Sequence, residues 1–295
     1  MNIVKKAGLA ALMAFVMMFV LVPVFAEETD KANAVAYVTR KDSDQAEYFD
    51  TLQSALNAVQ DGGSVVLLQD ITGNGPSFRV GGGKSFSFDL AGHEIRYRPD
   101  GNPNFKHLFI IDNSRATLSI KNSSDRAGLI KGQFTGVSIF YLNTGTLEFG
   151  EHNSYIQTPW QHFLVYNKYG HVVINGGSLE GLIALNREIT SVTMNGGILK
   201  HDSNKNCLSV ISGWDNSSQY DRYHLKITGG TIIGTIEDPG RPNQRRNGFI
   251  TGGLFSGRFR GAKPEERYIH PDYKLVETQY MTEKGPQPAW QVVKK

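Results

Sequence analysis

The feature that most constrains the fold is a four-residue phrase: an apolar residue, then Asn or Thr, then two glycines. It occurs at 174–177, 194–197, 227–230 and 250–253. The first glycines of successive copies are 20, 33 and 23 residues apart. Each copy follows a β-prone stretch and precedes a short apolar one. A repeat of this length indicates an array of small stacked units, none of which can bury its apolar face alone.

Short strands with Asn or Gly corners also fill the first half of the chain, for example at 108–111, 116–120 and 137–141. No helices lie between them, which excludes a doubly wound sheet and leaves an antiparallel sandwich or a parallel β-helix. In a parallel β-helix each corner lies about 4.8 Å above its predecessor. A corner that needs positive φ then needs Gly in every coil, whereas a sandwich gives no reason for such repetition.

We therefore predict an all-β solenoid of the parallel β-helix type. Its expected structural corners are Gly176, Gly177, Gly196, Gly197, Gly229, Gly230, Gly252 and Gly253. The preceding residues should form short ladders of like side chains, Asn175 with Asn195 and Thr228 with Thr251.

One helix is expected, ahead of the first coil, where the open end of the array needs a cover. Its apolar positions are Leu52, Ala55, Leu56 and Val59, at helical spacing. Asp50 or Thr51 can cap its N-terminus, and the glycines at 62–63 end it.

The first 26 residues have the features of a secretory signal peptide: Lys5 and Lys6, an apolar run at 7–25, and small Ala26 at the cleavage position. An uncleaved membrane anchor is the alternative. The expected organisation is a signal peptide (1–26), an N-terminal cap with the short helix (27–63), β-helix coils (64–257) and a C-terminal cap (258–295). The protein is expected to be secreted, with any retention at the cell surface non-covalent.

The net charge limits the classes of partner that the chain can bind, and the cysteine content limits its possible disulfides. Of 31 basic and 28 acidic residues, cleavage removes Lys5 and Lys6, leaving 29 against 28. A nearly neutral chain argues against nucleic acid, and no membrane association is expected after cleavage. The single cysteine, Cys207, cannot form an internal disulfide and is expected to be an inward-facing strand residue. Nothing in the sequence indicates an oligomeric state.

Residues 48–56 with 61–68 resemble the opening of right-handed parallel β-helix proteins exported by gut-type Firmicutes. Residues 88–95 resemble their next coil, and 252–256, 273–276 and 290–293 resemble their closing hairpin. The resemblance implies a right-handed β-helix of the pectate-lyase-like superfamily with a C-terminal capping β-hairpin. That superfamily includes carbohydrate-active enzymes, which favours a glycan ligand by analogy of fold.

No catalytic residue can be assigned. The hydrolase motifs Asn-x-Asp, Asp-Asp, Gly-His-Gly and Arg-x-Lys are not present as a set, and 92–94 and 170–172 each lack the second glycine of the third. Asp89 is expected to cap a turn. The eight histidines show no metal-ligand spacing, and 81–85 has the wrong spacing for a phosphate loop, so we expect no metal and no cofactor.

The longest interval between glycine pairs, 197–229, carries an aromatic and polar insertion at 213–224. Inserted loops of a solenoid commonly line its binding face, and aromatic rings beside Asp and Asn suit sugars. A second aromatic group lies about two coils earlier, some 10 Å along the axis, which would suit two or three sugar units. The expected ligand-binding residues are Trp160, His162, Tyr166, Trp214, Asp215, Tyr220, Asp221 and Tyr223. The alternative is that these aromatics only cover the solenoid flank.

The favoured function is an exported, non-catalytic β-helix that binds glycans or a surface protein. A divergent polysaccharide lyase or glycoside hydrolase is the first alternative, and a cluster of charged residues on one flank would favour it. A structural or assembly module is the second.

Overall fold

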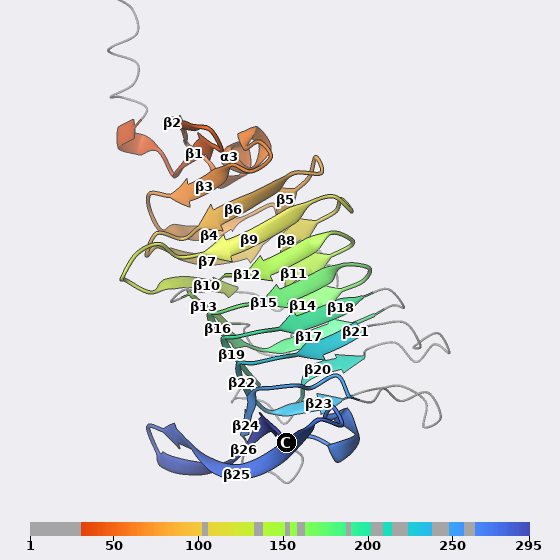
Figure 1. Ribbon diagram of the computed structural model, residues 1–295. Coiled ribbons are helices and arrows are strands. Elements are labelled where there is room, and N and C mark those ends of the chain that lie inside the picture. Colours follow the sequence, from red (N-terminus) through yellow and green to blue (C-terminus); the bar gives the residue numbers. More distant parts are fainter. Residues whose placement is uncertain are drawn as a thin grey trace, which may run out of the picture.

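The computed structural model describes residues 31–101, 106–132, 138–150, 154–157, 163–186, 190–201, 209–213, 224–237, 248–256 and 263–295. These residues form a right-handed parallel β-helix, confirming the predicted fold class. Figure 1 shows its strands stacked from the N-terminal cap to the C-terminal hairpin. The leader lies outside the described residues. Within the described ranges, no helix combines the length and apolar character needed to cross a bilayer.

Three sheets form the walls, and each is named here by a letter. Sheet A contains, in spatial order, β2 (Ser43–Phe49), β1 (Ala36–Arg40), β3 (Ser64–Leu67), β6 (Ser85–Asp89), β9 (Thr117–Lys121), β12 (Thr146–Phe149), β15 (His171–Ile174), β18 (Ser191–Met194) and β21 (His224–Ile227). Sheet B contains β25 (Tyr273–Thr282), β26 (Gly285–Lys294), β24 (Leu254–Ser256), β22 (Thr231–Ile233), β19 (Ile198–Lys200), β16 (Ser178–Glu180), β13 (Ser154–Gln157), β10 (Gly128–Gly132), β7 (Glu94–Pro99) and β4 (Ile71–Gly75). Sheet C contains β23 (Thr235–Glu237), β20 (Ser209–Gly213), β17 (Leu182–Leu185), β14 (Phe163–Asn167), β11 (Ser138–Leu142), β8 (His107–Ile111) and β5 (Phe78–Val80).

A full coil therefore has three strands, one in each sheet, in the order A, B, C. The strands named from the sequence, 108–111, 116–120 and 137–141, belong to sheets C and A, so this pattern shows two strands per coil where the structure has three. The strands it missed belong mainly to sheet B, whose members are short or polar, such as β16 with three residues and β4 with the sequence ITGNG. Strands this short carry too few alternating positions to stand out as a period-two pattern.

The interior is a continuous apolar column because every strand turns alternate side chains inward. Phe109 and Phe140 stack in successive coils with ring centroids 5.3 Å apart, and both are fully buried. Phe78 and Phe88 contact Phe109 at 5.3 and 5.9 Å. Each coil thus buries its apolar face against the next, as the repeat required.

The N-terminal cap contains the predicted helix, α3 (Leu52–Ala58). Thr51 caps it, since its side-chain oxygen accepts a hydrogen bond from the backbone N–H of Ser54 at 3.1 Å. Leu52, Ala55 and Leu56 are buried as the spacing predicted. The sequence did not predict the antiparallel pairing of β1 with both β2 and β3, which extends sheet A beyond the first coil.

The two glycines of each repeated phrase have different physical roles. The second has positive φ in every copy: 78° at Gly177, 71° at Gly197, 81° at Gly230 and 102° at Gly253. The first allows close approach, because a Cβ on Gly196 or Gly229 would collide with the carbonyl oxygen of Asn175 or Asn195 in the preceding coil. The predicted positive-φ corner is therefore confirmed for the second glycine only.

The predicted asparagine ladder is also present. Asn195 Nδ2 donates to Asn175 Oδ1 at 2.8 Å, and Asn175 Nδ2 donates to Glu148 Oε1 at 2.7 Å. Thr228 extends the ladder, because its hydroxyl donates to Asn195 Oδ1 at 2.7 Å. Thr251 instead places its hydroxyl 3.5 Å from the carbonyl oxygen of Ile227.

The predicted C-terminal hairpin is formed by β25 and β26, and β26 pairs antiparallel with β24. A 3₁₀ helix, η4 (Glu266–Tyr268), precedes it. The hairpin ends the parallel stack, as the chain passes from β24 into antiparallel strands (Figure 1).

Candidate functional site

Of the eight expected ligand-binding residues, only Tyr166 lies within the described residues. Trp160, His162, Trp214, Asp215, Tyr220, Asp221 and Tyr223 lie outside them. The strands on either side still define the connections. Segment 158–162 joins β13 to β14, and segment 214–223 joins β20 to β21.

Both aromatic segments connect to strands of the same sheet. The first segment leads into β14 and the second leaves β20, and both strands belong to sheet C. Because β17 lies between them, they are two coils apart, as the sequence predicted. The segments adjoin opposite ends of the sheet C strands, so the outer surface of this sheet lies between their attachment points.

Tyr166 lies on that outer surface. Its neighbours Val165 and Asn167 are buried, while Tyr166 is half-exposed. It pairs in register with Tyr141 of the preceding coil, and the two rings stack at 5.8 Å with an interplanar angle of 21°. His107 also stacks on Tyr141, at 4.4 Å and 16°, and its ring centroid lies 6.5 Å from that of Tyr166.

Polar groups continue from these rings toward the C-terminal ends of the strands. Tyr141 Oη donates to Asn143 Oδ1 at 3.4 Å, and Asn143 Nδ2 donates to Asp112 Oδ1 at 2.8 Å. Arg79 Nη1 lies 3.9 Å from Asp112 Oδ2. One coil beyond Tyr166, Asn186 Nδ2 donates to its hydroxyl.

We call this surface the sheet C face: Asp112, Tyr141, Asn143, Tyr166 and Asn186. It presents ring edges, hydroxyls, amides and one carboxylate from four consecutive coils. Tyr141 covers one face of the Tyr166 ring by stacking, and the ring of Phe163 lies 5.5 Å from that of Tyr166, tilted by 43°.

The sequence analysis did not select Asp112, Tyr141, Asn143 or Asn186. A signal for three of them was available, since each is a polar residue that directly follows the last apolar residue of a sheet C strand: Ile111, Leu142 and Leu185. Recognising it requires the three-strand coil register, which the sequence did not reveal.

His107 is nearly buried, at 9% exposed, and its Nδ1 lies 2.8 Å from the hydroxyl of Ser138. Burial lowers the pKa of His107 to about 4, so the ring is neutral near pH 7. Ser138 is itself fully buried. A histidine and serine enclosed in this way link adjacent coils and offer substrate no access to a nucleophile.

A second polar surface runs along sheet B. One outward residue from each of five consecutive strands lies in register, and we call this set the sheet B row: Arg96, Lys131, Gln157, Glu180 and Lys200. Arg96 Nε donates to Glu94 Oε2 at 2.6 Å. Lys200 Nζ lies 3.3 Å from Glu180 Oε2, and the Glu180 side chain is only 4% exposed.

Asp89 has the structural role expected for it. Its Oδ1 accepts hydrogen bonds from the backbone N–H groups of Ala91 and Ser123, both at 2.9 Å. Among the described residues, no group of three or more His, Cys, Asp or Glu side chains is arranged to hold a metal ion.

The fold and these surfaces define the class as a right-handed parallel β-helix with polar residues aligned on the outside of its sheets. No family model matches the chain, and no curated protein or solved structure matches it.

Proposed function

We propose that this chain is an exported β-helix protein that binds glycans on the sheet C face. The observation that carries the proposal is the alignment of Tyr141, Asn143 and Asp112 with Tyr166 and Asn186 across four coils. The connections carrying Trp160 and Trp214 adjoin the same sheet at opposite ends of its strands. Aromatic and amide groups in this combination suit sugar hydroxyls and apolar C–H faces.

The spacing of the coils supports a chain-like ligand. Equivalent positions recur about every 4.8 Å along the axis, so a glycan lying along the sheet would meet a similar polar set at each coil. The sheet strands hold these side chains rigidly, which lowers the entropy lost on binding. The tryptophans of the two connections would add further ring faces for stacking against sugar rings.

The signal-peptide features support export. The resemblance of the opening, second coil and closing hairpin to exported Firmicutes β-helix proteins supports a place in the pectate-lyase-like superfamily. Export and a place in that superfamily are parts of the proposal. A cell-surface glycan as the natural partner is also part of it.

A glycan array with the chain from Glu27 to Lys295 tests the proposal. We expect binding to at least one glycan class, and we expect Tyr166→Ala to weaken it about tenfold, or about 1.4 kcal/mol. Trp160→Ala and Trp214→Ala should also weaken binding. Tyr280→Ala is the matched control, because Tyr280 is a half-exposed tyrosine on the C-terminal hairpin.

Failure has two distinguishable forms. The absence of binding to any glycan would remove the proposed function. Binding that Tyr166→Ala, Trp160→Ala and Trp214→Ala all leave unchanged would keep the function and remove the site.

The sheet B row favours a second candidate, a divergent polysaccharide lyase. Such an enzyme needs a cation to neutralise a uronate carboxylate and a base to take the α-proton. The row places Lys131 and Lys200 on strands β10 and β19, with Glu180 beside Lys200. Incubation with pectin and alginate would decide it: ultraviolet absorbance of unsaturated uronates, lost in Lys131→Ala and Lys200→Ala, would establish a lyase. No absorbance change with either polymer would argue against it.

A further inference from the structure

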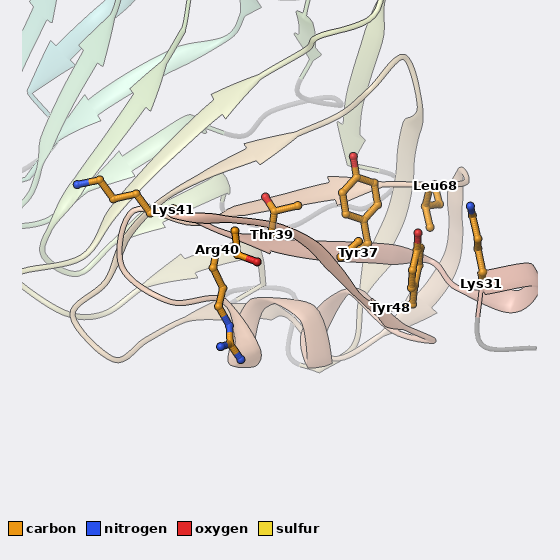
Figure 2. Close-up of a pocket in the computed structure, with 9 residues that line it drawn as sticks. Lys31, Tyr37, Thr39, Arg40, Lys41, Tyr48 and Leu68 are labelled. Carbon is orange, nitrogen blue, oxygen red and sulfur yellow. The ribbon is translucent and has the colours of Figure 1, made fainter. Parts of the chain in front are cut away.

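A groove at the N-terminal end of the solenoid is separate from both surfaces described above. It has a volume of about 480 Å³, within the range typical of small-ligand sites. Figure 2 shows its lining, drawn mainly from β1, β2 and the turn between them. The residues that matter here are Lys31, Tyr37, Thr39, Lys41, Ser43 and Tyr48.

Two tyrosines form the centre of the groove. Tyr37 of β1 and Tyr48 of β2 pair directly across the antiparallel strands. Their rings are 5.9 Å apart and tilted by 49°, compared with 21° for the stacked pair Tyr141 and Tyr166. Both side chains are partly exposed, so ring surface is accessible to a ligand. Burial, followed by the charge of Asp89, raises the pKa of Tyr37, so its hydroxyl remains a hydrogen-bond donor at neutral pH.

The described lining of the groove is cationic. It includes Lys31, Arg40 and Lys41, and none of the described side chains that line it is acidic. In Figure 2 the side chains of Lys31 and Lys41 lie at opposite ends, while Arg40 points to the other side of its strand. Lys31 Nζ lies 6.0 Å from the centroid of the Tyr48 ring. The two ammonium groups therefore flank the tyrosines, and an anionic group at either end would meet a cation.

Asp89 is the nearby acid that acts on Tyr37, but its charge already has partners. Its carboxylate accepts two backbone N–H groups, and Lys121 Nζ lies 3.9 Å from it. Thr39 and Ser43 add hydroxyl groups to the groove. Open aromatic surface, hydroxyls and two flanking ammonium groups together match a ring that has an apolar face, several hydroxyls and a negative charge.

We propose that this groove binds a single anionic sugar unit, with the sugar ring against Tyr37 and Tyr48 and the anionic group beside Lys31 or Lys41. A lysine acts as a point charge and accepts either carboxylate or sulfate, so the shared chemistry is an anionic sugar. The site does not depend on the sheet C face, since the two lie on different sheets.

Titrations followed by amide NMR test this proposal with four probes: methyl glucuronide, methyl glucoside, methyl glucoside 6-sulfate and inorganic sulfate. We expect at least one anionic sugar to bind about tenfold more tightly than methyl glucoside at low ionic strength. Its shifts should centre on Tyr37, Thr39 and Tyr48. The difference should shrink at about 0.5 M salt, because the ammonium groups are partly exposed.

Variants distinguish the contribution of the lysine charge to binding from that of the tyrosine rings. Replacing the lysine beside the anion, by Lys31→Gln or Lys41→Gln, should weaken the anionic sugar about two- to fivefold and leave methyl glucoside unchanged. Lys226→Gln is the matched control, since Lys226 is an exposed lysine on β21, at the far end of the same sheet. Tyr48→Ala should weaken both sugars, and Tyr48→Phe should retain binding. Tyr166→Ala should have no effect, which separates this groove from the sheet C face.

Preference for the glucuronide or for the sulfate ester identifies the anionic group, and either result supports the proposal. Three results would overturn it: no preference for anionic over neutral sugar, equal binding of inorganic sulfate and the sulfated sugar, or effects of both Lys31→Gln and Lys41→Gln that are no larger than that of Lys226→Gln. Lys41 is exposed on a turn, so its variant remains informative even if Tyr48→Ala does not fold.

Discussion

Replacing single glycines by alanine should separate the two constraints at the solenoid corners. Gly197 has a φ of 71°, and a Cβ there would lie 2.6 Å from the carbonyl oxygen of Gly176 and 2.9 Å from that of Gly177. Both oxygens are backbone atoms of the preceding coil, so neither can rotate away. Gly197→Ala therefore faces an unfavourable φ and a contact between coils.

The expected cost follows from these distances. Alanine at this φ costs about 1–2 kcal/mol. Relieving the contact requires the corner to move by about 0.5 Å, which would stretch the backbone hydrogen bond from Ile198 N–H to Gly177 O, now 2.9 Å. Loss of one or two such bonds costs about 1 kcal/mol each. We expect Gly197→Ala to lower the free energy of unfolding by about 3 kcal/mol.

Two other glycines provide the controls. Gly285 has a φ of 94°, but nothing lies within 4 Å of a Cβ placed there, so Gly285→Ala should show the φ cost alone, about 1–2 kcal/mol. Gly81 has no close neighbour and no positive φ, so Gly81→Ala should be neutral or stabilise by up to about 1 kcal/mol. Urea unfolding followed by far-UV circular dichroism measures all three. If Gly197→Ala costs no more than Gly285→Ala, the close-packed corner is refuted.

Three further predictions concern the scaffold. Ala91 has a φ of 47°, and Ala91→Gly should stabilise the chain by about 0.5–1 kcal/mol in urea unfolding; a loss of stability would contradict backbone strain there. Asn195→Ala removes the ladder bonds to Asn175 and Thr228 and should cost about 1 kcal/mol, and an unchanged urea midpoint would show that the ladder contributes nothing. Because the pKa of His107 is about 4 when folded and near its ordinary 6.5 when unfolded, its contribution to stability is complete above pH 6.5 and is lost as pH falls toward 4. Between pH 7.5 and 4 this contribution should lower the free energy of unfolding of the wild type by about 3 kcal/mol, and the decrease should be smaller in His107→Gln. Equal decreases in the two proteins would refute the prediction.

The sequence predicted the fold class because the corner chemistry is local. A positive φ restricts the residue type at Gly177, Gly197, Gly230 and Gly253 whatever surrounds them. The helix at Leu52–Ala58 was likewise predictable from its spacing and its cap at Thr51.

The third strand of each coil was not predictable in this way. Strands such as Ser178–Glu180 have only one clearly inward position, Leu179, between less regular neighbours. Their strand character comes from pairing with the coils above and below. That is a tertiary effect, which a single sequence does not display.

The sheet C face was missed for a related reason. Asn143 and Asp112 are 31 residues apart, and only the coil register brings Asn143 Nδ2 to Asp112 Oδ1. The sequence drew attention to eight ligand-binding candidates, of which Tyr166, on β14, is the one within the described residues. Its ring stacks on Tyr141, a contact that depends on coil length rather than on any local motif.

Amide chemical-shift mapping with the oligosaccharide that binds best on a glycan array is the most direct test of the proposed function. The account predicts that the largest shifts fall on Asp112, Tyr141, Asn143, Tyr166 and Asn186, across four consecutive coils of sheet C. Shifts confined to the sheet B row, around Lys131, Glu180 and Lys200, or binding that leaves the sheet C face unperturbed, would contradict it.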